Sequence, residues 1–191
     1  MSIYKRLANV FNGLDPEQRE GLPEHVKWLE DALVSVASEA EAEAALICGP
    51  LPEPLDVIAE RAGIEDKESL RKNLEGAGEA GIVMMCYLDA DKKVLGYYRA
   101  CMLPGLAENL ATGKRVTKEG AFWIDNYCKS SNMTVYPNSV PFRGGFRALP
   151  VREAIPAETK ICKYDEIEPY LEANDTFSVA NCACRTSTKL L

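Results

Sequence analysis

Apolar side chains recur with helical spacing through the first quarter of the chain. The first set is Ile3, Leu7, Val10 and Phe11. These residues share one face of a helix that Gly13 ends. The same spacing returns over residues 24–36. A third helix is expected over residues 38–48, because Ser38 can accept a hydrogen bond from a first-turn N–H and the glutamates that follow suit the positive end of the helix dipole.

The clearest local pattern lies between residues 54 and 100. Asp66 suits the N-cap of a helix in which Leu70 and Leu74 lie on the apolar face. Helix, turn, helix and β-hairpin is the order of a winged helix-turn-helix, so the sequence predicts such a domain here. The predicted elements are helices over residues 54–63 and 66–81 and β-strands over residues 82–88 and 94–100.

Beyond residue 100, short helices and strands alternate. The pattern predicts helices over residues 103–110, 119–128 and 164–174. It predicts strands over residues 147–152, 159–162 and 176–184, and an irregular segment over residues 130–146. The apolar residues of 103–110 suit either a dimer contact or simple core. The sequence therefore predicts an α+β protein: a helical and winged-helix domain over residues 1–112, then a small α+β unit over 113–191 that leads into a Cys-x-Cys site.

The charge of the chain weighs against a nucleic-acid partner. Its 191 residues carry a net charge of −7, and no segment forms a basic platform of the kind that phosphate binding needs. In the second helix of the predicted winged domain, Lys67, Arg71 and Lys72 are balanced by four acidic residues. We therefore interpret the winged helix as a structural or protein-docking element and keep DNA binding as the alternative.

Seven cysteines are spread through a chain with no secretory signal and no apolar run long enough to span a membrane. This combination predicts a cytoplasmic protein with reduced thiols and no membrane contact. Five of the cysteines are interpreted as small apolar core residues.

The other two, Cys182 and Cys184, form the candidate metal site. On the strand predicted for residues 176–184, side chains two apart point to the same face, so both thiols can converge on one soft metal centre. A disulfide between them would be strained, and Arg185 adds a positive charge beside an anionic thiolate centre. Because two ligands are only half of a site, we expect the chain to be the front part of a longer protein.

The sequence offers no recognisable catalytic set. His25 is its only histidine, and no nucleophile motif lies near it. A dinucleotide fingerprint and a phosphate-binding loop are also absent. We therefore expect the chain not to be an enzyme by itself, but an electron carrier or a component of an oxidoreductase.

Several segments resemble one family. They are residues 3–8 and 38–43, the predicted winged helix, residues 147–151, 155–159 and 164–167, and the block 178–185. In these segments the chain resembles the N-terminal region of bacterial and archaeal 4Fe-4S ferredoxin-type proteins. The resemblance implies that Cys182 and Cys184, with Arg185 beside them, belong to a [4Fe–4S] site that later cysteines complete. Because this sequence contains none of those later cysteines, we expect the cluster in the full-length protein and none in this chain alone.

Three functions remain open at this point. The favoured one is the N-terminal accessory region of an iron–sulfur electron-transfer protein, which positions a redox partner protein or the clusters. The alternative is a winged-helix regulator that binds DNA in response to redox state or metal. The third is a structural adaptor without metal. The sequence indicates no oligomeric state.

Overall fold

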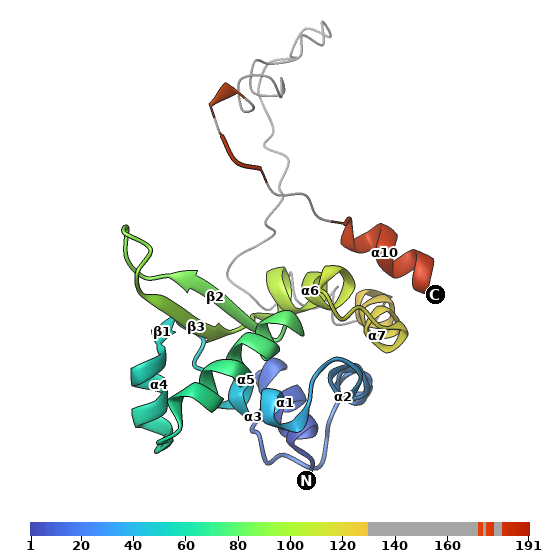
Figure 1. Cartoon of the computed structure of the whole chain (residues 1–191). Helices are drawn as coiled ribbons and strands as arrows, with labels where there is room; N and C mark the ends of the chain where they lie inside the picture. The colour runs from blue at the N-terminus through green and yellow to red at the C-terminus, as the bar shows by residue number, and fades with distance from the viewer. Residues whose placement is uncertain (130–171, 174, 178–180) are drawn as a thin grey trace, which may run out of the picture. The chain divides into compact units, whose positions relative to one another are not determined.

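The computed structural model describes residues 1–129, 172–173, 175–177 and 181–191 (Figure 1). The chain divides into two compact units, residues 1–133 with 181–191 and residues 134–180. The described part is mainly helical with one small antiparallel sheet, which confirms the α+β class. The elements predicted between residues 130 and 171 lie outside the described residues. None of the helices in the described part has the length and apolar character needed to cross a membrane.

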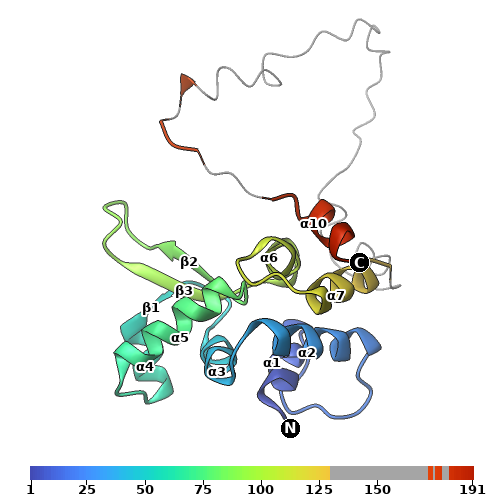
Figure 2. The ribbon, with the colours of Figure 1, turned by 45° about the vertical axis from the view of Figure 1, so that its right-hand side comes forward.

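Three helices form the N-terminal part of the first unit: α1 (Ile3–Phe11), α2 (Glu24–Val36) and α3 (Glu39–Ile47). All three confirm the helical pattern of the sequence. Helix α1 packs against both α2 and α3 (Figure 2). The contact is fully apolar at its centre, where Leu7, Leu29 and Leu33 have no exposed surface. Burying such side chains is the main source of stability in this part of the chain.

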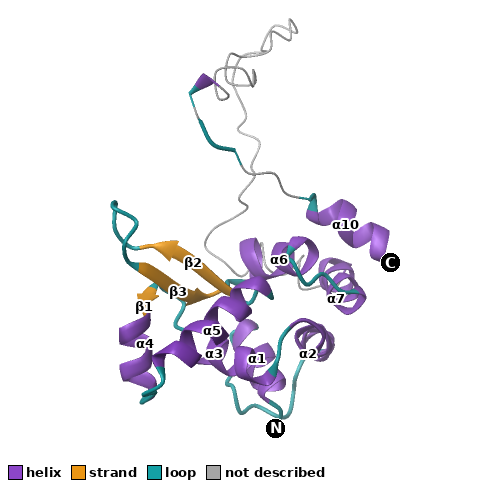
Figure 3. Cartoon of the chain, in the orientation of Figure 1, coloured by secondary structure: helices purple, strands orange, loops and turns teal. Residues whose placement is uncertain are grey.

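The sheet lies between residues 53 and 99. Its elements are β1 (Glu53–Pro54), α4 (Leu55–Ala62), α5 (Lys67–Glu79), β2 (Val83–Tyr87) and β3 (Leu95–Arg99). The strands lie in the order β1-β3-β2, all antiparallel (Figure 3). Local signals account for the two helices, because Gly63 ends α4 in the left-handed conformation and Asp66 accepts the Ser69 N–H over 3.0 Å at the start of α5. The predicted helix pair and hairpin are confirmed; β1 was not predicted.

The rest of the unit is helical. A π-helical turn (Met102–Leu106) leads into α6 (Ala107–Thr112), and α7 (Lys118–Lys129) and α10 (Ala183–Leu190) follow. Helix α7 packs on α2, and α10 packs on α6 and α7, where Ser187 Oγ donates to the carbonyl of Ala121 over 3.4 Å. Leu106 and Leu110 are buried, so the apolar stretch at 103–110 contributes to the core. The boundary predicted at residue 112 falls inside this unit.

The strand predicted over residues 176–184 is wrong at its end. Asn181 and Cys182 are irregular, and α10 begins at Ala183, so that Cys184 and Arg185 are helical. Residues 178–180 lie outside the described part. The sequence signal for a strand was weak here because alanine and arginine favour helices. Helix α10 also packs on α7, where the buried Ser187 donates a hydrogen bond to Ala121.

An ion pair between Arg115 and Glu41 joins distant parts of the unit. Arg115 donates from Nη1 and Nη2 to the two carboxylate oxygens of Glu41 over 2.7 and 2.9 Å, and from Nη1 to the carbonyl of Val36 over 3.1 Å. Glu41 also accepts the backbone N–H of Ser38 over 2.8 Å, which completes the capping box of α3. Burial raises the pKa of Glu41, but the hydrogen bonds from Arg115 and Ser38 outweigh burial, so the pKa lies below its ordinary value.

Gly76, in the interior of α5, faces this ion pair. A Cβ atom at position 76 would overlap with the carboxylate of Glu41 and lie 3.2 Å from its Cγ. Glycine is the least favourable residue for a helix interior apart from proline. Its presence here is explained by the close approach of α5 to Glu41, which leaves no room for a side chain.

We expect Gly76→Ala to lower the free energy of unfolding by about 1–2 kcal/mol, because the new methyl group displaces Glu41 from Arg115 and this loss exceeds the gain in helix propensity. Urea unfolding followed by circular dichroism measures the change. In the Glu41→Ala background no carboxylate is displaced, so the same substitution should stabilise by about 0.5–1 kcal/mol. An equal loss in both backgrounds would contradict this explanation of Gly76.

Candidate functional site

The predicted metal-site residues lie at the start of α10. Cys182 is exposed and occupies the N-cap position in an extended conformation, with φ −70° and ψ 119°. Cys184 lies in the first turn of the helix, and Arg185 follows it with an exposed side chain. The alternation of a strand therefore does not apply to these residues. That Cys182, Cys184 and Arg185 belong to a metal site stays a prediction.

A helix start offers thiols a different advantage. The first N–H groups of a helix have no partner within it, and the helix dipole places partial positive charge at this end. Both effects favour the thiolate form, which is the form that binds metal. Cys182 occupies this position at the start of the eight-residue α10. Within the described residues, no group of three or more His, Cys, Asp or Glu side chains is placed to hold a metal ion.

The cysteines outside this pair differ in their surroundings. Cys48 is 2% exposed, and burial raises the pKa of its thiol to about 11, with Arg99 opposing the shift. Cys86 is half-buried and Cys101 is exposed. The interpretation as core residues is therefore confirmed for Cys48 and wrong for Cys101, which lies just before the π-helical turn. Cys162 lies outside the described residues.

The basic residues of α5 are all paired with carboxylates. Arg71 donates from Nη2 to Glu68 over 2.7 Å and from Nη1 to Glu75 over 2.6 Å. The remaining pairs are Lys72 with Glu68 at 3.8 Å and Lys67 with Asp56 at 2.6 Å. The hydrogen bond from Arg71 lowers the pKa of Glu68, which keeps this carboxylate ionised. The outer face of α5 thus presents balanced ion pairs instead of a run of positive charge.

The chain matches no known family. Comparison with models of protein families, with curated proteins and with solved structures gives no match.

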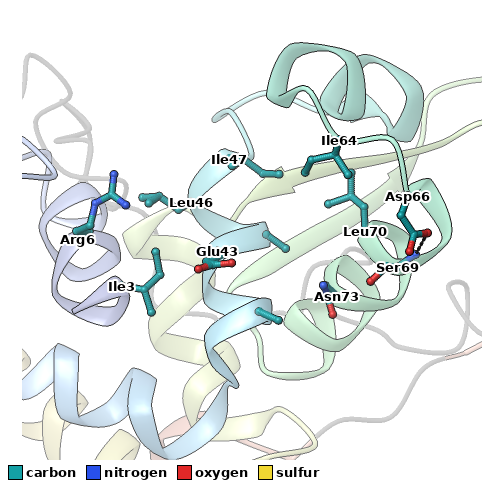
Figure 4. Close-up of a pocket in the computed structure, with 12 residues that line it drawn as sticks. Ile3, Arg6, Glu43, Leu46, Ile47, Ile64, Asp66, Ser69, Leu70 and Asn73 are labelled. Atoms are coloured by element: carbon teal, nitrogen blue, oxygen red, sulfur yellow. Dashed lines mark hydrogen bonds between the residues drawn. The ribbon is translucent and has the colours of Figure 1, made fainter. Parts of the chain in front are cut away.

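A cavity of about 440 Å³ lies between α1, α3 and the start of α5 (Figure 4). Its apolar side chains come from all three regions: Ile3, Leu46, Ile47, Ile64 and Leu70. Two of its charged residues already have structural partners, since Arg6 pairs with Glu17 over 2.6 Å and Asp66 caps α5. Glu43, Ser69 and Asn73 add polar groups.

His25 contributes to packing between helices. It lies in the first turn of α2, as the sequence suggested, and its Nε2 lies 2.9 Å from Oδ1 of Asn12. Its ring also meets the ring of Tyr127 edge to face, with centroids 5.6 Å apart. Burial lowers the pKa of His25, so the neutral imidazole is favoured. These contacts tie α2 to α7 and to the end of α1.

Sequence reasoning missed Arg115, Glu41 and Gly76 as a connected set. Arg115 lies 74 residues from Glu41 in the chain, and no local pattern relates them. The one available signal was Gly76 itself, because a glycine within a helical pattern indicates a close approach of another group.

The rate of alkylation should differ between the buried and the exposed cysteines. In mildly alkaline buffer we expect iodoacetamide to modify Cys101 and Cys182 at least about tenfold faster than Cys48, because Cys48 is buried and its pKa is raised. Peptide mass spectrometry over a time course measures the three rates. In concentrated urea, the control condition, the difference should disappear. Rapid labelling of Cys48 in the folded chain would contradict the structure around it.

Proposed function

We propose that this chain is the docking region of an iron–sulfur electron-transfer protein. In this proposal residues 39–100 form a winged helix-turn-helix that contacts a protein partner instead of DNA. The order α3, β1, α4, α5, β2, β3 supports the winged-helix interpretation. The observation that carries the docking role is the pairing of every basic residue of α5 with a carboxylate.

Those ion pairs oppose DNA binding for a simple electrostatic reason. Affinity for DNA comes largely from cations that replace counterions at the phosphates. The guanidinium of Arg71 is already held by Glu68 and Glu75, so it would have to give up three charge-assisted hydrogen bonds to reach a phosphate. The two carboxylates would then face the DNA backbone. A protein surface with matching polar groups meets neither difficulty.

The metal part of the proposal is supported by the chemistry at the start of α10. Cys182 and Cys184 would supply soft sulfur ligands to an iron–sulfur cluster, which transfers electrons when bound. Arg185 would raise the reduction potential by placing positive charge near the anionic centre. Because two thiols do not complete a cluster site, the proposal requires further ligands besides Cys182 and Cys184.

The ligand role predicts a loss of iron on substitution. We expect the complete natural protein, purified without oxygen, to contain iron and acid-labile sulfide, and the double variant Cys182→Ser, Cys184→Ser to lose most of both, because serine is a poor ligand for these clusters. Metal and sulfide analysis per chain measures the loss. The matched control is Cys101→Ser, which removes an exposed cysteine outside the pair. Unchanged iron content in the double variant would reject the ligand role.

A DNA-binding regulator is the second candidate, because the element order is also that of DNA-binding winged helices. If docking is correct, gel shifts should give no salt-sensitive binding by the wild-type chain, whereas Glu68→Gln, Glu75→Gln should create weak non-specific binding by releasing Arg71. The matched control adds Arg71→Ala to that variant and should abolish the new binding. Wild-type binding that weakens with Arg71→Ala, Lys72→Ala would favour the regulator.

A further inference from the structure

The cavity between α1, α3 and the start of α5 combines an apolar lining with a small number of polar side chains. Its volume of about 440 Å³ falls within the range that is typical of sites for small molecules. Ala44 and Leu70, which are 3% and 4% exposed, belong to the core and also line the cavity. Ile3, Ile47 and Ile64 are partly buried and pack against the same core. The apolar lining is therefore continuous with the hydrophobic core.

Glu43 brings a carboxylate into this apolar lining. It shares a face of α3 with Ala40, three residues before it, and Ile47, four residues after it, and both also line the cavity. Figure 4 shows the Glu43 carboxylate between side chains of α1 and α5. The residues at positions 40 and 44 are alanines, whose short side chains leave this exposed carboxylate accessible from the cavity.

Within the described part of the chain, no basic side chain pairs with Glu43. Helix α3 contains no basic residue, and Glu39, one turn before Glu43, adds a second negative charge. Arg6 is the basic residue of the lining, and it pairs with Glu17 over 2.6 Å. The basic residues of α5 are likewise paired with carboxylates. The Glu43 side chain thus makes neither a hydrogen bond nor an ion pair with the described residues.

The α5 side of the cavity supplies further oxygen atoms. Asp66 accepts the backbone N–H of Ser69 over 3.0 Å, whereas the Ser69 hydroxyl and the Asn73 amide have no hydrogen-bond partner among the described residues. Two acidic residues and one basic residue line the cavity, so the lining is negatively charged. An ammonium group has three N–H donors and no acceptor, so carboxylate, hydroxyl and amide oxygens all match it.

We propose that this cavity binds a primary alkylammonium group, with the ammonium at Glu43 and the aliphatic chain along the apolar lining. An ion pair that is fully exposed contributes little to binding, because water competes with it. Here the aliphatic chain would displace water from the apolar side chains beside Glu43, so that the ion pair is partly shielded while apolar surface is buried. The candidate metal residues play no part in this cavity, so the inference stands independently of the proposed function.

Titration of the 191-residue chain with hexylammonium chloride at neutral pH, followed by NMR of the backbone amides, tests the proposal. We expect saturable binding, with the largest chemical-shift changes at the lining residues of α3 and α5, such as Glu43, Ile47 and Asn73. Hexanol keeps the aliphatic chain without the charge, and methylammonium keeps the charge without the chain. Each should bind at least about fivefold more weakly than hexylammonium, because each lacks one of the two contributions.

Three variants separate charge from shape. Glu43→Gln keeps the size of the side chain but removes its charge, so it should raise the dissociation constant of hexylammonium at least about fivefold. The matched control is Asp31→Asn, which removes one negative charge from an exposed position of α2 outside the lining and should leave the constant unchanged. Ala40→Leu fills part of the cavity from an exposed position without any change of charge, and it should also weaken binding.

A second titration, with N-acetyl-lysine methylamide, separates two sources of the alkylammonium group. Tighter binding than that of hexylammonium would identify the lysine side chain of a protein as the ligand, and weaker binding would identify a free alkylamine. The absence of saturable binding by both probes would overturn the proposal. So would binding of hexylammonium that Glu43→Gln leaves unchanged, or binding of hexanol that is as tight as that of hexylammonium.

Discussion

The first unit depends on the ion pair between Arg115 and Glu41. Arg115 binds the carboxylate with both Nη atoms, and the same carboxylate closes the N-terminus of α3. The side chains are 34% and 12% exposed, so the pair is partly shielded from water and stronger than an ordinary surface pair. It joins α3 to the chain after α6, and the Glu41 side chain that it holds lies so close to α5 that a side chain at position 76 would displace it. Helix α5 packs on α3 beside this contact, and the sheet packs on α5 in turn.

Charge balance on α5 then limits what this part of the molecule can bind. A helix that follows a short turn and precedes a hairpin is a common DNA-reading arrangement, but an arrangement of elements does not define a partner. Here Glu68 and Glu75 occupy the positions one turn before and after Arg71, where their carboxylates satisfy the guanidinium. Met85 and Tyr87 on the hairpin are among the exposed apolar side chains of the described part, as are Leu51 and Val57 outside it. The ion pairs of Arg71 are the observation on which the proposed docking role rests.

The two cysteines near the C-terminus lie at the start of a helix and not on the predicted strand. On a strand, Cys182 and Cys184 would share a face. In the structure Cys182 occupies the N-cap position of α10 without a side-chain capping hydrogen bond, and Cys184 lies in the first turn. The strand argument therefore does not apply, whereas a helix start in general favours thiolates for another reason. The residues proposed for the metal site are unchanged, but the physical support for them is different.

The sequence alone determined most elements of the described part, because their signals are local. Ser38, Gly63 and Asp66 define helix ends by hydrogen bonds and backbone angles within a few residues, and the alternation around the polar turn defines the hairpin. Tertiary structure decided the rest. Strand β1 has two residues and exists only because β3 lies beside it, and α10 is held by its packing on α6 and α7. For the candidate site, the sequence predicted which residues belong to it but not their geometry. No short-range pattern encodes which distant side chains will meet. Arg115 and Glu41 are an example of such a meeting, since 74 positions separate them in the chain.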